Sequence, residues 1–269
     1  MIETAINAAI EAGKAILKIY GKAALEVELK EDQSPLTLAD KDSHAVIKDM
    51  LKKTGYPVLS EEGVPVPYEE RKQWEYYWLV DPLDGTKEFI KRNGDFTVNI
   101  ALIHKNRPSL GVVYVPVTKE LYYASDKGSW KAVFDPLIDR LREPLALSNR
   151  SFHKGGSIKI VASKSHLNED TANFIRTLEK QFVRTEILSR GSSLKFCMMA
   201  EGLADIYPRF GPTMEWDTAA GHAIAMHAGL EVLQAENGRE LTYNKENLLN
   251  PCFIVKLKNF DMIPLNNME

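Results

Sequence analysis

Apolar residues recur with helical spacing at the beginning of the chain. Ile2, Ile6 and Ile10 lie four residues apart, which predicts an amphipathic helix over residues 2–20. Gly21 suits the end of this helix, because glycine tolerates the backbone conformation that terminates many helices. The first element is therefore predicted to be a helix with one face to bury against a sheet or another helix.

Short apolar runs bounded by turn residues predict the strands of the first half. These runs cover residues 25–29, 56–60, 76–80, 95–104, 111–116, 120–124 and 128–132. A second helix is predicted after residues 36–40, with Ile47 and Leu51 on its apolar face. Residues 106–108 predict a turn, and the short connections that follow predict antiparallel hairpins.

From residue 148 onward, helices and strands follow one another more evenly. The predicted strands are 158–162, 204–207, 230–233 and 253–257, and the predicted helices are 168–182, 194–200 and 215–227. This mixture predicts an α/β (α+β) fold of alternating layers rather than a doubly wound sheet. We divide it into an N-terminal half, residues 1–147, with most candidate metal ligands, and a C-terminal half, residues 148–269, with candidate substrate-binding residues and the last metal ligand.

Composition excludes several classes of function. The chain has 269 residues and a net charge of −3, so no basic field attracts nucleic acid or an anionic membrane. No apolar run reaches the ~20 residues of a membrane span. The first residues include an acid rather than the basic residues that begin a signal peptide, so no signal peptide is expected. We expect a cytoplasmic protein with a small-molecule substrate and no evident protein partner. Cys197 and Cys252 are expected to be buried, reduced thiols.

The candidate chemistry centres on residues 78–89, Trp-Leu-Val-Asp-Pro-Leu-Asp-Gly-Thr-Lys-Glu-Phe. A buried strand is predicted to end at Asp81, because Pro82 lacks the N–H that the next strand bond needs. A tight turn with Gly85 at positive φ is expected next. The carboxylates of Asp81 and Asp84 suit Mg²⁺, and N–H groups at a helix start suit phosphate.

Two other interpretations of this segment are less favourable. An Asx turn after a buried strand explains one Asp-Gly pair, but not two carboxylates three residues apart together with Thr86. Haloacid-type phosphatases place a nucleophilic Asp two residues before the second one, where this chain has Pro82. We therefore expect no aspartyl-phosphate intermediate.

Acidic residues stand at element boundaries in distant parts of the chain. They are Asp40, Glu61, Asp81 with Asp84, and Asp217. If these boundaries converge, the acids predict a polynuclear metal site. Like charges a few ångströms apart oppose ionisation, so two or three Mg²⁺ ions would be needed to neutralise them. Asp40, taken alone, is equally suited to be the N-cap of its helix.

Three motifs resemble those of the lithium-sensitive inositol monophosphatase superfamily: Asp81-Pro-Leu-Asp84-Gly-Thr86, Glu61-Glu62 and Trp216-Asp217-Thr-Ala-Ala-Gly221. The resemblance implies the layered α/β/α/β/α sandwich of the inositol monophosphatase and fructose-1,6-bisphosphatase type. It also implies that Mg²⁺ would be held by Glu61, Asp81, the Leu83 carbonyl, Asp84 and Asp217, the attacking water by Asp40 and Thr86, and the phosphate by the N–H groups of Gly85 and Thr86. No covalent intermediate would form.

Residues 87–89, Lys-Glu-Phe, and residues 191–196, Gly-Ser-Ser-Leu-Lys-Phe, resemble the 3′(2′),5′-bisphosphate nucleotidase branch. The expected reaction is Mg²⁺-dependent hydrolysis of the 3′-phosphate of 3′-phosphoadenosine 5′-phosphate, by direct attack of a metal-activated water, to AMP and phosphate. This step belongs to sulfur metabolism, and the family analogy implies inhibition by lithium. The alternatives are an inositol monophosphatase or sugar-bisphosphatase, or a non-catalytic, metal-dependent nucleotide-binding protein.

Further residues are candidates for substrate choice. Ser192, Lys195 and Arg209 supply a hydroxyl and two cations that could bind the second phosphate of an adenosine bisphosphate. By the resemblance, His166 would line the nucleotide pocket. Lys195 could instead be a solvated helix position, and His166 a surface loop residue.

Overall fold

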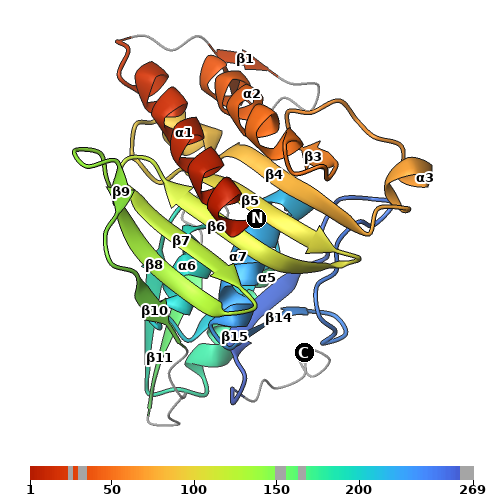
Figure 1. Ribbon diagram of the computed structural model, residues 1–269. Helices are drawn as coiled ribbons and strands as arrows, with labels where there is room; N and C mark the ends of the chain where they lie inside the picture. The colour runs from red at the N-terminus through yellow and green to blue at the C-terminus, as the bar shows by residue number, and fades with distance from the viewer. Residues whose placement is uncertain (24–26, 30–34, 149–155, 163–167, 261–269) are drawn as a thin grey trace.

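Two β-sheets and the helices that cover them alternate in layers (Figure 1). The computed structural model describes residues 1–23, 27–29, 35–148, 156–162 and 168–260. No helix in these ranges is both long and apolar enough to cross a membrane. The predicted helices at 2–20, 194–200 and 215–227 are confirmed with those bounds.

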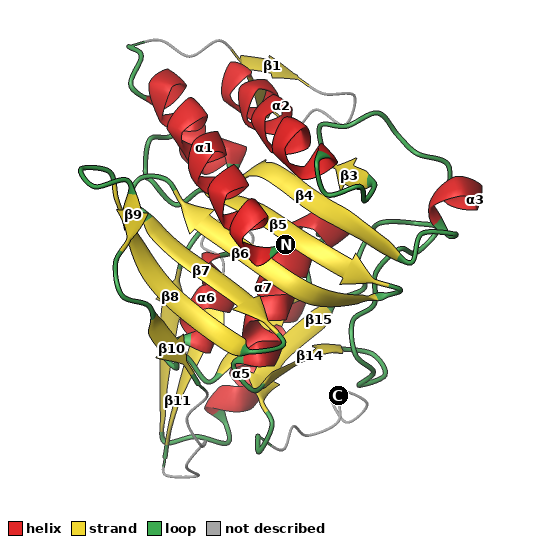
Figure 2. Cartoon of the chain, in the orientation of Figure 1, coloured by secondary structure: helices red, strands yellow, loops and turns green. Residues whose placement is uncertain are grey.

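The larger sheet has eight strands in the order β10-β8-β7-β6-β5-β4-β3, with β9 paired to β8 (Figure 2). Its strands are β3 (Val58–Ser60), β4 (Tyr76–Asp84), β5 (Thr97–His104), β6 (Arg107–Val115), β7 (Glu120–Ser125), β8 (Gly128–Asp135), β9 (Arg140–Leu141) and β10 (Leu145–Leu147). Short connections make β5 to β8 antiparallel neighbours, as predicted. β3 and β4 run parallel, so both end at the same edge of the sheet.

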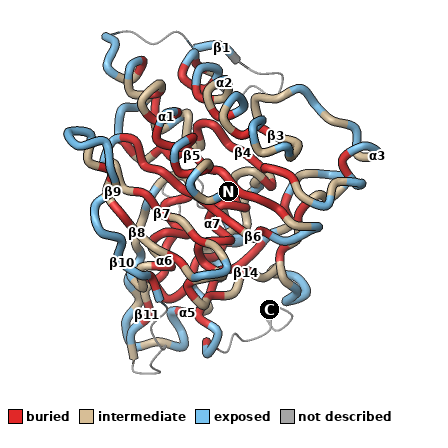
Figure 3. Tube along the Cα trace, viewed as in Figure 1, coloured by how far each residue is buried: buried red, intermediate tan, exposed pale blue. Residues whose placement is uncertain are grey.

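One face of this sheet is covered by α1 (Ile2–Tyr20) and α2 (Leu38–Lys52), and a two-stranded sheet of β1 (Val27–Leu29) and β2 (Pro35–Thr37) precedes α2. Side chains alternate along β4, because successive residues of a strand point to opposite faces. Trp78 and Val80 therefore pack in the core beneath α1 and α2. Tyr77 and Leu79 belong to a second core on the opposite face. The central strands are buried along their length (Figure 3).

The second core lies between the two sheets and contains α6 (Leu194–Ala200) and α7 (Glu215–His227). α7 contacts β4 to β8 on one side and β14 of the smaller sheet on the other. Gly111 of β6 permits this close approach, because a Cβ there would collide with the carbonyl oxygen of Ala220. α7 is thereby held against the strands that end in the candidate site.

The smaller sheet has the strand order β12-β11-β13-β15-β14. Its strands are β11 (Ser157–Ala162), β12 (Arg184–Ser189), β13 (Ile206–Arg209), β14 (Leu230–Gln234) and β15 (Phe253–Leu257). α6 contacts β11, β13 and β15, and α5 (Glu169–Glu179) contacts β12 and β13. The predicted layered α/β/α/β/α arrangement is confirmed.

Three local predictions are wrong. β4 does not stop at Asp81 but continues to Asp84. Pro82 lacks a donor and only interrupts the ladder to β5, which resumes at Asp84 after a shift in register. Arg107 and Pro108 belong to β6 rather than to a turn. Cys252 is exposed, while Cys197 is buried as expected.

Five short elements have no counterpart in the predictions: β2, α3 (Tyr68–Arg71), β9, β10 and β12. β12 is an edge strand, parallel to β11, and its polar sequence Arg-Thr-Glu-Ile-Leu-Ser lacks the apolar run of a buried strand. α4 (Thr86–Ile90) begins directly after Gly85, where a helix start was predicted, and its five residues are too few to show a periodic pattern.

Candidate active site

The end of β4 has an irregular conformation that carries several candidate residues. The pairing register with β5 shifts between Asp81 and Asp84, and the Leu83 N–H donates to Asp81 Oδ1 at 3.0 Å. Gly85 follows with φ at 92° as the N-cap of α4, a conformation that residues with a Cβ rarely adopt. Asp81, Leu83, Asp84 and Gly85 all line one pocket of about 350 Å³.

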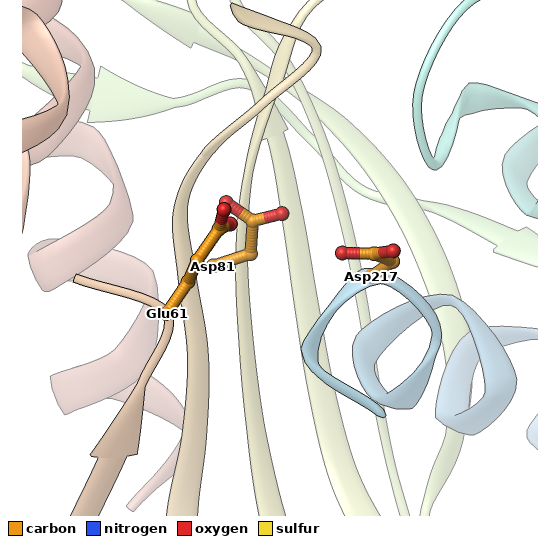
Figure 4. A group of neighbouring side chains, drawn as sticks. All are labelled: Glu61, Asp81 and Asp217. Atoms are coloured by element: carbon orange, nitrogen blue, oxygen red, sulfur yellow. The ribbon is translucent and has the colours of Figure 1, made fainter. Parts of the chain in front are cut away.

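Three carboxylates from three elements meet at this pocket. Glu61, Asp81 and Asp217 each offer an oxygen, and these oxygens lie within 4.8 Å of one another (Figure 4). Glu61 directly follows β3, and its N–H donates to the Val80 carbonyl at 3.1 Å, which places it beside Asp81. Asp217 lies in the first turn of α7, where its Oδ2 accepts from the Met214 N–H at 2.8 Å. The predicted convergence of these three acids is present in the structure.

Burial and mutual repulsion perturb the acids of the pocket. The pKa of Asp217 is raised well above its usual value by burial, and the negative charges of Asp84 and Glu61 raise it further. Burial also raises the pKa of Asp84, although the nearby Lys195 ammonium opposes this effect. The deprotonated cluster is therefore unfavourable without a compensating positive charge.

The donor chemistry of the cluster fits a hard divalent cation. Glu61, Asp81 and Asp217 supply carboxylate oxygens only, which is the ligand type that Mg²⁺ prefers. Such a cation would relieve the repulsion that raises the pKa of Asp217. Residues of this kind fit a magnesium site better than a site for a soft metal, because the cluster contains no Cys or His.

Asp84 lies in the same pocket but outside the group of three. Its Oδ2 lies 2.9 Å from Ser193 Oγ and accepts from Asn99 Nδ2 at 3.2 Å. Ser193 Oγ also lies 2.8 Å from the Asp217 carbonyl oxygen. Ser193 and Asn99 thus connect Asp84 to the beginning of α7.

Asp40 and Thr86 are brought together from α2 and α4. Thr86 Oγ1 donates toward Asp40 Oδ1 at 3.1 Å, and it lies 3.3 Å from the Leu83 carbonyl oxygen. Asp40 Oδ2 accepts from the N–H of Thr37 at 2.7 Å and from its hydroxyl at 2.6 Å. Thr37, rather than Asp40, is the N-cap, and Asp40 is the third residue of the helix in a capping box. Burial raises the pKa of Asp40, while the bonds from Thr37 act in the opposite direction.

Lys195 is buried, with 4% of its surface exposed, so the alternative of a solvated helix position is wrong. Its ammonium donates to the Ser192 carbonyl at 2.6 Å and to the Arg190 carbonyl at 3.3 Å. Burial lowers its pKa to about 8, with Asp84 opposing the shift and Arg209 adding to it. The Lys195 side chain lines the pocket, and with a pKa of about 8 it is mostly protonated at neutral pH.

Ser192 and Arg209 line the same pocket as Lys195. Arg209 Nη2 donates to the Pro212 carbonyl at 3.1 Å, whereas its buried Nε has no hydrogen-bond partner among the described residues. A buried N–H without an acceptor is uncommon. His166 lies outside the described residues.

Sequence reasoning missed two polar residues that hold the site together, Asn99 and Ser193. Asn99 is 1% exposed, and a polar side chain within the apolar run of β5 was an available signal for it. Ser193 adjoins the predicted Ser192, and spacing alone does not distinguish the two hydroxyls. Tyr207 and Trp216 also line the pocket.

Comparison with known proteins identifies the family. The model of the inositol monophosphatase family matches residues 1–255. The chain therefore belongs to the inositol monophosphatase family, as its motifs indicate. A crystal structure of the extragenic suppressor protein suhB from Bartonella henselae has the same fold, with a TM-score of 0.73 at 23% identity over 95% of this chain and 93% of the other.

More similar relatives narrow this assignment to the bisphosphate nucleotidase branch that residues 87–89 and 191–196 predict. The chain is 46% identical to the 3′(2′),5′-bisphosphate nucleotidase CysQ of Salmonella typhimurium over 96% of this chain and 100% of that protein. It is 45% identical to the CysQ of Escherichia coli K12 with the same coverage. The crystal structure of CysQ from Bacteroides thetaiotaomicron superimposes with a TM-score of 0.84 at 49% identity, over 96% of this chain and 97% of the other.

The raised pKa of Asp217 predicts how stability depends on pH without metal. The contribution of the protonated Asp217 carboxyl to folding stability is present below the ordinary carboxyl pKa of 3.8. It is lost as the pH rises through the raised pKa. Mg²⁺ at about a hundredfold excess over its Kd should restore ~2.7 kcal/mol at pH 8. Thermal unfolding should show a rise in Tm of about 5–10 °C with Mg²⁺ at pH 8 and a much smaller rise at pH 5.

Asp217→Asn provides the matched comparison, because the amide oxygen can still accept from the Met214 N–H. Without metal, this variant should be at least as stable as the parent protein at pH 8, and its Tm should respond weakly to Mg²⁺. An equal Mg²⁺ response in both proteins would show that Asp217 is not a ligand.

Proposed function

We propose that this chain is a Mg²⁺-dependent phosphatase that removes the 3′-phosphate of 3′-phosphoadenosine 5′-phosphate to give AMP and phosphate. The convergence of Glu61, Asp81 and Asp217 within 4.8 Å is the observation that carries the proposal. It is supported by the names of the relatives at 45–46% identity, 3′(2′),5′-bisphosphate nucleotidase CysQ.

Two or three Mg²⁺ ions would be held by Glu61, Asp81, the Leu83 carbonyl, Asp84 and Asp217. When bound, such ions neutralise phosphoryl oxygens and lower the pKa of bound water. Asp84 would reach them by exchanging the bonds that it now makes to Ser193 and Asn99. Ser193 would then keep its contact with the Asp217 carbonyl and hold the two halves of the site in register.

The pair Thr86 and Asp40 would orient and deprotonate the attacking water. Thr86 Oγ1 is 3.1 Å from Asp40 Oδ1. As the hydroxyl accepts a proton from water, it can therefore pass its own proton to Asp40. Thr37 fixes the other carboxylate oxygen of Asp40, which leaves Oδ1 facing Thr86. The N–H groups of Gly85 and Thr86 would hold the phosphate, since an anion is stabilised at the beginning of a helix.

Substrate choice would come from the opposite wall of the pocket. Ser192, Lys195 and Arg209 would bind the second phosphate, because all three line the pocket and two of them carry positive charge. The buried position of Lys195 strengthens this interaction, because little water screens its charge. By family resemblance, His166 would contact the nucleotide.

The substrate assignment predicts the order of activity on a panel of phosphate esters. kcat/KM for 3′-phosphoadenosine 5′-phosphate should exceed that for adenosine 3′-monophosphate, inositol 1-phosphate and fructose 1,6-bisphosphate by at least about tenfold, because each charged bond to the second phosphate contributes ~1.5–3 kcal/mol. Phosphate release measured with and without Mg²⁺ tests this order. Equal or reversed preference would favour an inositol monophosphatase or sugar-bisphosphatase, and no turnover with Mg²⁺ would favour a non-catalytic nucleotide-binding protein.

The role of the Thr86 hydroxyl predicts different results for two substitutions. Thr86→Val keeps the shape of the side chain but removes the hydroxyl, so kcat should fall by about a hundredfold or more with little change in KM. Thr86→Ser keeps the hydroxyl and should retain kcat within about tenfold of the parent. Steady-state kinetics at saturating Mg²⁺ would contradict the assignment if both variants lost activity equally or if Thr86→Val remained fully active.

A further inference from the structure

The turn of residues 190–193 carries the substrate side of the pocket and has an unfavourable backbone conformation. Ser192 has φ at 36°, in the left-handed region that residues with a Cβ rarely occupy. Such a conformation persists only where neighbouring groups hold it in place. α6 begins directly after this turn, so the turn sets where Ser192 and Lys195 enter the pocket.

Asp95, in the loop between α4 and β5, supplies three contacts to this turn. Its Oδ2 accepts from the Gly191 N–H at 3.2 Å, and its Oδ1 accepts from Arg190 Nη1 at 3.0 Å. Its carbonyl oxygen accepts from Ser192 Oγ at 3.1 Å. A Cβ at Gly191 would lie 2.7 Å from the Asp95 carbonyl oxygen, so the two backbones are in close contact.

The same residue adjoins the phosphate loop on its other side. A Cβ at Gly85 would lie 3.2 Å from the Asp95 carbonyl oxygen and 3.4 Å from the Ser192 Cβ. Asp95 is therefore located between the loop that would hold the reacting phosphate and the turn that would hold the second one. The Asp95 carboxylate accepts from Gly191 and Arg190, whereas the Thr86–Asp40 pair is joined by a hydrogen bond of its own.

Lys195 depends on the turn for the position of its charge. Both carbonyl oxygens that accept from its ammonium, those of Arg190 and Ser192, belong to the turn that Asp95 holds. A buried ammonium without these acceptors would be unfavourable, so a loosened turn would also displace the Lys195 charge. The geometry thus connects the Asp95 carboxylate to Lys195 through two backbone carbonyls.

We propose that Asp95 is a positioning residue for substrate choice: its carboxylate holds the turn of residues 190–193 so that Ser192 and Lys195 face the second phosphate. This inference rests on the proposed bisphosphate specificity. The bond to the Gly191 N–H carries more of the effect than the ion pair, because the Arg190 side chain is 55% exposed and exposed pairs contribute little.

Asp95→Ala tests the proposal against a substrate with and one without the second phosphate. For 3′-phosphoadenosine 5′-phosphate, KM should rise about tenfold with kcat changed less than about threefold, since a hydrogen bond to a charged acceptor is lost on the binding side only. For adenosine 3′-monophosphate, KM and kcat should both stay within about twofold of the parent. The concentration of Mg²⁺ that gives half-maximal activity should be unchanged.

Two further variants separate positioning from a general loss of structure. Asp95→Asn keeps an acceptor for the Gly191 N–H and should restore KM for the bisphosphate to within about threefold of the parent. Asp135→Ala is the matched control, because Asp135 also accepts from a backbone N–H, that of Leu137, and from an arginine, Arg142, but does not line the pocket. It should leave both substrates unaffected.

The outcomes distinguish this inference from the proposed function. If the parent protein does not prefer the bisphosphate, the proposed function fails, and the Asp95 variants are not needed to show it. If the parent prefers the bisphosphate but Asp95→Ala leaves its KM unchanged, or impairs both substrates equally, the positioning role is wrong. Should Asp95→Ala fail to fold, the comparison of Asp95→Asn with Arg190→Ala tests the positioning role instead. A larger rise in KM for the bisphosphate in Arg190→Ala would overturn the assignment of the Gly191 bond.

Discussion

The structure depends on bringing three carboxylates of like charge to one point and holding them there; Asp81 is buried, and Glu61 and Asp217 are half-buried. Glu61, Asp81 and Asp217 meet within 4.8 Å, and burial, together with the negative charges of Asp84 and Glu61, raises the pKa of Asp217 well above its usual value. Folding energy from the surrounding core must hold this arrangement until a cation compensates it. The site accordingly lies where strands β3 and β4 of the larger sheet meet helix α7, rather than on a mobile loop.

Each carboxylate is held by an anchor of its own in the surrounding scaffold. The parallel pairing of β3 with β4 places Glu61 beside Asp81, and the Ser43 hydroxyl donates to the Pro82 carbonyl at 2.6 Å and fixes the irregular end of β4. The beginning of α7 is secured by the fully buried Glu215, which accepts from the N–H groups of residues 244 and 245. Glu215 thereby helps to present Asp217 to the two acids of the larger sheet.

Much of this architecture could be predicted from the sequence, because the spacing of apolar residues indicates amphipathic helices and apolar strands. The convergence of the acids was also predictable, since each stands at or near an element boundary. Properties set by tertiary packing were not. Lys195 is buried although its sequence position permits solvation, and Asp84 contacts Ser193 in the other half of the chain as well as Asn99 on the neighbouring strand. The division into residues 1–147, with most metal ligands, and residues 148–269, with the substrate-binding residues, stays a prediction, as do the individual roles in catalysis.

Anomalous X-ray scattering from crystals soaked in Mn²⁺ tests the central claim most directly, because Mn²⁺ accepts the same oxygen ligands as Mg²⁺ and can be located by its absorption edge. The account predicts a strong anomalous peak in contact with oxygens of Glu61, Asp81 and Asp217, and its loss in crystals of Asp217→Asn. An active enzyme whose Mn²⁺ peak lies away from all three carboxylates, or which shows no peak at saturating Mn²⁺, would contradict it.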